Sequence, residues 1–254
     1  MTEAETDALF ERAAEYMAER IEQAAIVELP SPYIFVEQMW PPALAAEILR
    51  NMYASEPSFS EQVHKGDPKN FFGSYRERIE LHLPAGASKL EPRLADFWKR
   101  LHAVTESDVL FAAIFNKFRS GFDDRYGSDW SAAEIHGMLR RGLLLTMHGP
   151  GYYLGPHTDR FEKVITCVFN FAEHDGLDDI GTAMYLPKQK GFTSDGDAHH
   201  DPALFEKIGM APFRPNSGLI FFREDRTFHG VEKLTAESLG DSKRPNIQLN
   251  FWAQ

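Results

Sequence analysis

Residues 154–174, LGPHTDRFEKVITCVFNFAEH, place a histidine and an aspartate one residue apart, after a glycine-proline turn and before a strongly apolar run. Residues i and i+2 of an extended chain point to the same side, so the His157 imidazole and the Asp159 carboxylate converge on one point. The pair therefore offers two adjacent metal ligands. Alone it is weak evidence, because a surface turn satisfies either residue.

A third ligand must come from elsewhere, and His229, in FFREDRTFHGVEKL at the entry of another expected strand, is the candidate. Two histidines and one carboxylate on one face of an octahedron leave three positions open, as in non-haem Fe(II) oxygenases. Zinc hydrolases also use two histidines and a carboxylate, but their helical H-E-x-x-H signature is absent from the sequence. A half-buried strand-end histidine is the plainer interpretation of His229 taken alone. The three residues together favour iron.

The last expected strand, KRPNIQLNFW at residues 243–252, has one polar and one apolar face. Alternation puts Arg244, Asn246, Gln248, Asn250 and Trp252 on one side, and Pro245, Ile247, Leu249 and Phe251 on the other. The polar side is either a solvated surface or the wall of a polar cavity. Arg244 favours the cavity wall, because a guanidinium fork is the natural receptor for the carboxylate of a cosubstrate bound beside the metal. Arg141 and Arg223 are the alternative receptors.

Short segments rich in β-branched and aromatic residues follow one another from about Arg141, separated by Gly, Pro, Asp or Asn; they are GLLLTMH, VITCVFNFA, TAMYLP, GLIFF, HGVEKL and NIQLNFW. Such a series predicts a sandwich or jelly roll. No linker composition divides the chain. We therefore expect one domain over residues 1–254, with a mostly helical support region at 1–140 and a β core at 141–254.

The first half of the chain favours helices. Apolar residues recur at helical spacing near the N-terminus, in PPALAAEILRNMYA at 41–54, at 90–104 and at 108–118, with a short strand at 33–36. Residues 55–78 are polar and turn-rich, which predicts a surface loop. Residues 188–212 form the longest interruption of the strand series, and we expect a mobile lid or a substrate-contacting insertion near the metal. The plain alternative for this segment is a short outer helix in DPALFEKIGM. The pair His199 and His200 could be a second metal site, but without further clustered ligands we expect a solvated surface pair.

Composition narrows the function further. The net charge of −11 repels phosphate backbones, so we expect neither nucleic acid nor an anionic membrane surface as a partner. The single cysteine, Cys167, excludes an intramolecular disulfide and suits a reducing compartment. The acidic N-terminus lacks the features of a secretory signal, and no apolar run is long enough to span a bilayer. These features predict a soluble cytoplasmic protein.

The order H-x-D, then a distal histidine, then an arginine on the next strand resembles the Fe(II)/2-oxoglutarate-dependent dioxygenases, in particular their prolyl 4-hydroxylase-like branch. The resemblance covers roughly residues 141–254 and the segment 33–54, and its pieces are YYLGPHTD, VITCVFNFA, GTAMYLP, PNSGLIFF, FHGVEKL and RPNIQLNFW. It implies a double-stranded β-helix in an α+β chain. It also implies that His157, Asp159 and His229 hold Fe(II) and that Arg244 pairs with the distal carboxylate of 2-oxoglutarate.

Two departures from that pattern concern the cosubstrate. Many prolyl hydroxylases carry a tyrosine on the strand before the H-x-D motif, where this chain has Thr146, Met147 and His148, with a tyrosine pair at 152–153 nearer the ligands. Asn246 stands where the family often has Ser or Thr, and keeps hydrogen-bonding ability. Thr146, Tyr153 and Asn246 are therefore the candidate secondary contacts to 2-oxoglutarate.

The chemistry that the resemblance implies is hydroxylation of an unactivated C–H bond with O2, coupled to conversion of 2-oxoglutarate into succinate and CO2. The carboxylate ligand favours hydroxylation over halogenation, and desaturation or ring formation are the other reactions left open. Fold does not decide the substrate. A small metabolite or natural-product intermediate is the first expectation, a peptidyl residue the second, and a non-catalytic β-helix binding module the contrasting hypothesis.

Overall fold

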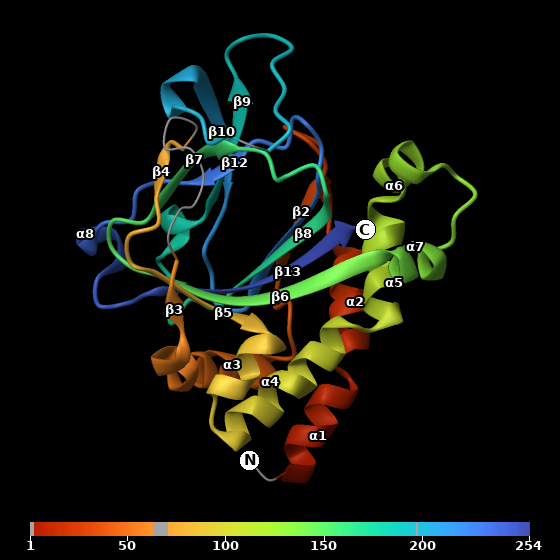
Figure 1. Cartoon of the computed structure of the whole chain (residues 1–254), viewed down its shortest axis with the longest axis vertical. Coiled ribbons are helices and arrows are strands. Elements are labelled where there is room, and N and C mark those ends of the chain that lie inside the picture. Colours follow the sequence, from red (N-terminus) through yellow and green to blue (C-terminus); the bar gives the residue numbers. More distant parts are fainter. Residues whose placement is uncertain (1–2, 63–70, 197) are drawn as a thin grey trace.

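The computed structural model describes residues 3–62, 71–196 and 198–254. Within these residues, thirteen strands form two antiparallel sheets that face each other (Figure 1). The larger sheet contains, in spatial order, β1 (Ile26–Val27), β2 (Tyr33–Glu37), β11 (Ser217–Phe222), β8 (Lys163–Asn170), β13 (Arg244–Ala253), β6 (Leu139–His148), β5 (Arg78–Leu83) and β3 (Ser60–Glu61). The smaller contains β10 (Phe205–Ala211), β9 (Thr182–Pro187), β12 (His229–Val231), β7 (Tyr153–His157) and β4 (Gly73–Ser74). The architecture is a double-stranded β-helix, as the family resemblance implies.

Helices from the first half of the chain gather on one side of the larger sheet (Figure 1). They are α1 (Glu3–Glu11), α2 (Ala13–Gln23), α3 (Pro42–Ser55), α4 (Pro92–Thr105), α5 (Asp108–Lys117), α6 (Arg119–Tyr126) and α7 (Ala132–Met138), and the short α8 (Ala236–Leu239) follows β12. No helix in the described part of the chain is long and apolar enough to cross a membrane.

The main core lies between these helices and the sheet. Alternation along the central strands sends one set of side chains into it: Cys167 of β8 and Leu249 of β13 are register partners, and both are fully buried with the helix residues Met17 and Ile21. The opposite face of the same strands looks toward the smaller sheet. The two faces predicted for residues 243–252 are thus a core face and an inward polar face.

Most predicted elements are confirmed. The helices expected at 41–54, 90–104 and 108–118 correspond to α3, α4 and α5, and the six expected strands to β6, β8, β9, β11, β12 and β13.

One expectation and one alternative are wrong. The stretch 55–78, taken as a loop, contains β3 and β4 and leads into the unpredicted strand β5; its residues 63–70 lie outside the described part. DPALFEKIGM is not a helix, because only a single 3-10 turn, Pro202–Leu204, precedes the strand β10.

Candidate active site

His157, Asp159 and His229 converge between the two sheets because of strand register. His157 ends β7 and His229 begins β12, and the two are direct partners across this antiparallel pair. Their rings lie 4.4 Å apart between centroids. One ligand atom from each of the three residues lies within 4.8 Å of the others. Two imidazoles and a carboxylate at this spacing are a donor set that suits a divalent metal ion with three positions left open.

Backbone carbonyls select the tautomer of both histidines. Nδ1 of His157 lies 3.0 Å from the Gly155 carbonyl oxygen, and Nδ1 of His229 lies 2.9 Å from that of Thr227. A carbonyl only accepts, so each Nδ1 carries the proton and donates it. The Nε2 lone pair of each ring is therefore left for a metal, the arrangement found at most protein metal sites.

Asp159, which is 8% exposed, is held at both oxygens. The Lys163 ammonium donates to Oδ1 at 2.8 Å, and the Thr166 hydroxyl donates to Oδ2 at 2.5 Å. Burial by itself would raise the pKa of Asp159, but the Lys163 charge and the neighbouring imidazoles hold that pKa well below its usual range. The carboxylate is thus ionised, and each oxygen keeps a lone pair for a metal.

The three residues line a cavity of about 710 Å³ between the sheets, and Arg244 lines the same cavity. Arg244 is 2% exposed. Its guanidinium donates to neutral acceptors: the Ile180 carbonyl at 2.7 Å, the Asn246 side-chain oxygen at 2.9 Å and the Thr182 hydroxyl at 3.3 Å. Burial lowers the pKa of Arg244 to about 10, so it is charged at neutral pH.

Among the described residues, no carboxylate forms an ion pair with Arg244. A buried guanidinium with neutral partners is a ready receptor for an incoming anion. The two alternative receptors lie elsewhere. Arg141 pairs with Glu106 at 2.8 Å, and Arg223 binds the Asp159 backbone oxygen at 3.0 Å; neither lines the cavity.

The predicted secondary contacts take different places. Asn246 is fully buried. Its side-chain oxygen accepts a hydrogen bond from the Arg244 guanidinium, and its side-chain nitrogen donates to Asn170 at 2.5 Å, so Asn246 helps to position Arg244. Thr146 is buried and donates to the Asn246 carbonyl at 3.4 Å. Neither Thr146 nor Tyr153 lines the cavity. Tyr152 and His148 do so instead, with their rings stacked 4.1 Å apart.

Sequence reasoning missed Arg78, Lys163 and Thr166, which also line the cavity. One signal was present: in RIELHL, residues 78–83, polar and apolar residues alternate as they do in a half-buried strand.

The segment 188–204 is attached to the metal-ligand region. The Thr158 hydroxyl donates to the Ser194 carbonyl oxygen at 2.9 Å, and the His200 backbone N–H donates to the Pro156 carbonyl oxygen at 2.8 Å. The His199 ring lies 4.2 Å from the His157 ring and lines the cavity, while His200 is half-buried beside Phe205. The expectation of a solvated surface pair for these histidines is therefore wrong.

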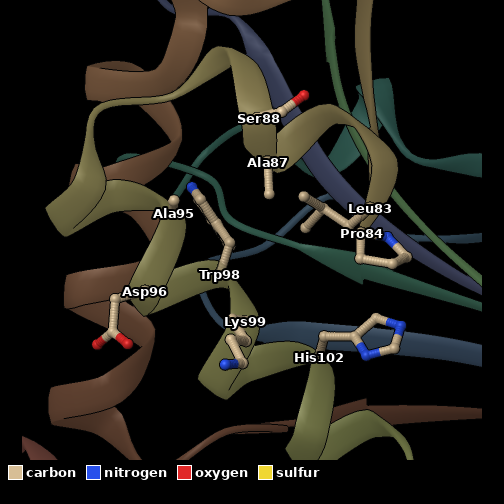
Figure 2. A pocket seen from close by; sticks show the side chains of 9 residues that line it. All are labelled: Leu83, Pro84, Ala87, Ser88, Ala95, Asp96, Trp98, Lys99 and His102. Atoms are coloured by element: carbon tan, nitrogen blue, oxygen red, sulfur yellow. The ribbon is translucent and has the colours of Figure 1, made fainter.

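A second cavity, of about 520 Å³, lies on the helical side of the molecule (Figure 2). It is formed by α4 and the segment 83–88, with Trp98 at its wall and Asp96, Lys99 and His102 around it. None of the predicted site residues lines it. The chemistry-bearing side chains belong to the cavity between the sheets.

Comparison with solved structures gives the same fold. A prolyl-4-hydroxylase from Pseudomonas putida aligns with a TM-score of 0.50 and 10% identity, over 94% of this chain and 99% of that one. An oxidoreductase of the 2OG-Fe(II) oxygenase family from Burkholderia pseudomallei aligns with a TM-score of 0.45 and 9% identity, over 93% and 89% of the two chains. No protein-family model matches the sequence, and no relative was found among curated proteins. At this identity the likeness to the P. putida enzyme shows a shared fold.

Proposed function

We propose that this chain is an Fe(II)- and 2-oxoglutarate-dependent dioxygenase that hydroxylates an unactivated C–H bond of a small molecule. The observation that carries the proposal is the meeting, in one cavity, of a buried two-histidine, one-carboxylate cluster and a buried arginine without an anionic partner among the described residues. A binding module has no need for all four side chains. The cavity volume falls within the range of small-molecule sites.

Each of these residues has a distinct task. His157, Asp159 and His229 would hold Fe(II), and their hydrogen bonds fix the lone pairs that face it. When bound, iron and 2-oxoglutarate together supply the oxidising power that uses O2 and yields succinate and CO2. Arg244 would bind the distal carboxylate of 2-oxoglutarate, held in place by Asn246, Thr182 and the Ile180 carbonyl. Asp159, His229 and Arg244 are buried between the two sheets, which limits the access of bulk water to the reacting groups.

Anaerobic titration with Fe(II) tests the ligands. His157→Ala and Asp159→Ala should each lose iron binding, because removing one of three ligands costs far more affinity than removing an outer partner. The exposed His174, changed to Ala, serves as control. Undiminished iron binding by both ligand variants would exclude this assignment.

The charge-transfer absorption that accompanies chelation of 2-oxoglutarate by Fe(II) tests Arg244. Arg244→Lys keeps the charge and loses the fork, so it should weaken 2-oxoglutarate binding, and Arg244→Ala should weaken it more. Succinate formation separates a dioxygenase from a non-catalytic binding module. A peptide substrate is the alternative to a small molecule, and turnover stimulated by metabolite or peptide pools discriminates the two.

A further inference from the structure

Two buried side-chain nitrogens beside Arg244 lack a hydrogen-bond partner among the residues that the structure describes. They are Nε of Arg78, a residue 7% exposed, and Nε2 of His148, a residue 1% exposed. Both residues line the cavity that holds the metal ligands. A buried polar group left without a partner is unfavourable, so the two nitrogens favour a ligand that supplies acceptors; the unpartnered oxygens of Gln62 and Asn250 line the same cavity.

The sheet register places these donors together. His148 of β6 is the direct partner of Arg78 on one neighbouring strand and of Arg244 on the other. The three register partners Arg78, His148 and Arg244 form a row. Tyr152 covers this row, because its ring stacks on His148 and its hydroxyl accepts from Arg78 Nη1 at 3.3 Å. The row therefore carries two guanidinium groups with an imidazole between them.

His148 is a donor toward the cavity. Its Nδ1 lies 3.3 Å from Nη1 of Arg244. A guanidinium can only donate, so in the tautomer that uses this contact Nδ1 accepts and the proton of the neutral ring sits on Nε2. Burial, with Arg78 and Arg244 nearby, holds the pKa of His148 well below its ordinary value and keeps the ring neutral.

The charge of the cavity points to an anion. Four cationic side chains of described residues line it, namely Arg78, Arg160, Lys163 and Arg244, whereas Asp159 is the one carboxylate among the lining residues of that part of the chain. Two carboxylates outside the lining offset part of this charge: Glu80 lies 3.2 Å from Arg78 and is shared with His82, and Glu162 lies 3.5 Å from Arg160. One positive charge remains in excess. A divalent metal and dianionic 2-oxoglutarate cancel each other, so the balance stays positive after both bind. The protein as a whole has a net charge of −11, so the positive charge of the cavity is a local feature and not a property of the whole molecule.

We propose that Arg78 and His148 form a second carboxylate-binding position, separate from Arg244, and that the substrate is a small carboxylic acid held there. The inference rests on the proposed dioxygenase function and names its substrate class. Two donors on neighbouring strands match the two oxygens of one carboxylate, and the guanidinium supplies the compensating charge.

Binding to the anaerobic protein loaded with Fe(II) and 2-oxoglutarate tests this position. The probes are short aliphatic, aromatic and amino carboxylic acids, each paired with its primary amide. Calorimetry and the change in the charge-transfer band measure how tightly each probe binds. Acids should bind, and their amides should bind about tenfold more weakly or not at all. Arg78→Gln should remove the preference for the acid. His148→Phe should weaken acid binding, and His148→Gln, which keeps an N–H donor, should restore part of it.

Two further variants control for loss of folding and for a general effect of removing a positive charge. Arg78→Gln leaves Glu80 without its arginine, so the double variant Arg78→Gln/Glu80→Gln removes both charges of the pair and preserves a folded protein for the same measurement. Arg141→Gln removes one positive charge from the neighbouring strand β6, outside the cavity, and should leave acid binding unchanged.

Affinity for 2-oxoglutarate and for 2-oxopentanoate, which lacks the distal carboxylate, distinguishes this position from the cosubstrate site. Arg244→Gln should abolish the preference for 2-oxoglutarate, whereas Arg78→Gln should retain it. Loss of that preference in Arg78→Gln would overturn the proposal and assign Arg78 to the cosubstrate. Equal binding of acids and amides, or binding of neither, would overturn it as well. If wild-type protein with Fe(II) fails to bind 2-oxoglutarate, the dioxygenase function itself fails, and calorimetry of the acids on metal-free protein still reports on Arg78.

Discussion

At the scale of single residues, the candidate metal site is organised before any metal binds. Carbonyl groups fix the ring of each histidine, while a hydroxyl and an ammonium fix the Asp159 carboxylate. Thr166 is placed to do this because it lies on β8, whose inward face passes the metal ligands, and its register partner Asn250 lines the same cavity. Support of this kind lowers the cost of ordering the ligands on binding.

Thr166→Val should weaken Fe(II) binding about 10- to 100-fold, because the isosteric side chain no longer donates to Asp159. Titration with Fe(II) under anaerobic conditions gives the two dissociation constants. Thr105→Val is the matched control, since Thr105 is equally buried but lies in α4. An unchanged affinity in Thr166→Val would mean that Lys163 alone orients the carboxylate.

Three buried histidines should make stability depend on pH. Burial holds the pKa of His148, His157 and His229 below the ordinary 6.5 in the folded protein. Below about pH 6.5 the unfolded chain therefore binds protons that the folded chain does not, and the free energy of unfolding falls as the pH falls. Urea unfolding of metal-free protein between pH 7 and pH 5 measures this slope.

His148→Gln removes one of these groups, so the loss of stability over that range should shrink by up to about 2 kcal/mol. His174→Gln, at an exposed histidine, should leave the slope as it is in the wild type. Parallel slopes for wild type and His148→Gln would contradict the assignment of a neutral His148.

At the scale of elements, the described residues of the segment 188–204 pack against β7. The His200 and Phe72 carbonyls approach Gly155 so closely that a Cβ there would lie 2.3 and 2.6 Å from their oxygens. Gly196, at φ 96°, packs in the same way against the Asp159 backbone. Glycine is needed at both positions because another backbone approaches closely. The segment is thus a wall of the cavity, and its opening as a lid is still a prediction.

Gly155→Ala should displace this segment from β7 and speed tryptic cleavage at the exposed Lys188 and Lys190. Gly209→Ala is the matched control, because a Cβ at that position of β10 meets nothing within 4 Å. Cleavage should slow in the wild type when Fe(II) and 2-oxoglutarate are present, if the segment closes over the filled site. Equal cleavage rates for the two glycine variants would show that the contact does not hold the segment.

Elements also explain which parts of the site the sequence could predict. His157, Asp159 and His229 follow from local spacing and strand entry, and Arg244 from the alternation of one strand. Arg78 and His148 do not, because their meeting depends on the pairing of β5 with β6, a register that links distant segments. β10 was missed for a similar reason: its apolar residues Phe205, Ile208 and Met210 do not alternate strictly, and the register shifts between Lys207 and Gly209.

At the scale of the whole molecule, the two halves of the chain share one sheet. β2 and β5 come from the first 140 residues and flank strands from the second part, while the helices of the first part cover the outer face of that sheet (Figure 1). The larger sheet therefore has one face in the main core and the other on the cavity. Loosening the helical layer should lower stability without touching the ligands themselves.

Ile21→Ala tests this separation of support from chemistry. Ile21 of α2 is fully buried in the main core, so its truncation leaves a cavity and should lower the free energy of unfolding by about 2–5 kcal/mol. The same change at Ile26, which is 39% exposed in β1, should cost much less, because fewer contacts and less buried area are lost. Urea unfolding gives both values, and Fe(II) titration at low temperature, where Ile21→Ala is folded, should give the wild-type affinity. A large loss of Fe(II) affinity in folded Ile21→Ala would show instead that packing of α2 on the sheet sets the geometry of the metal ligands.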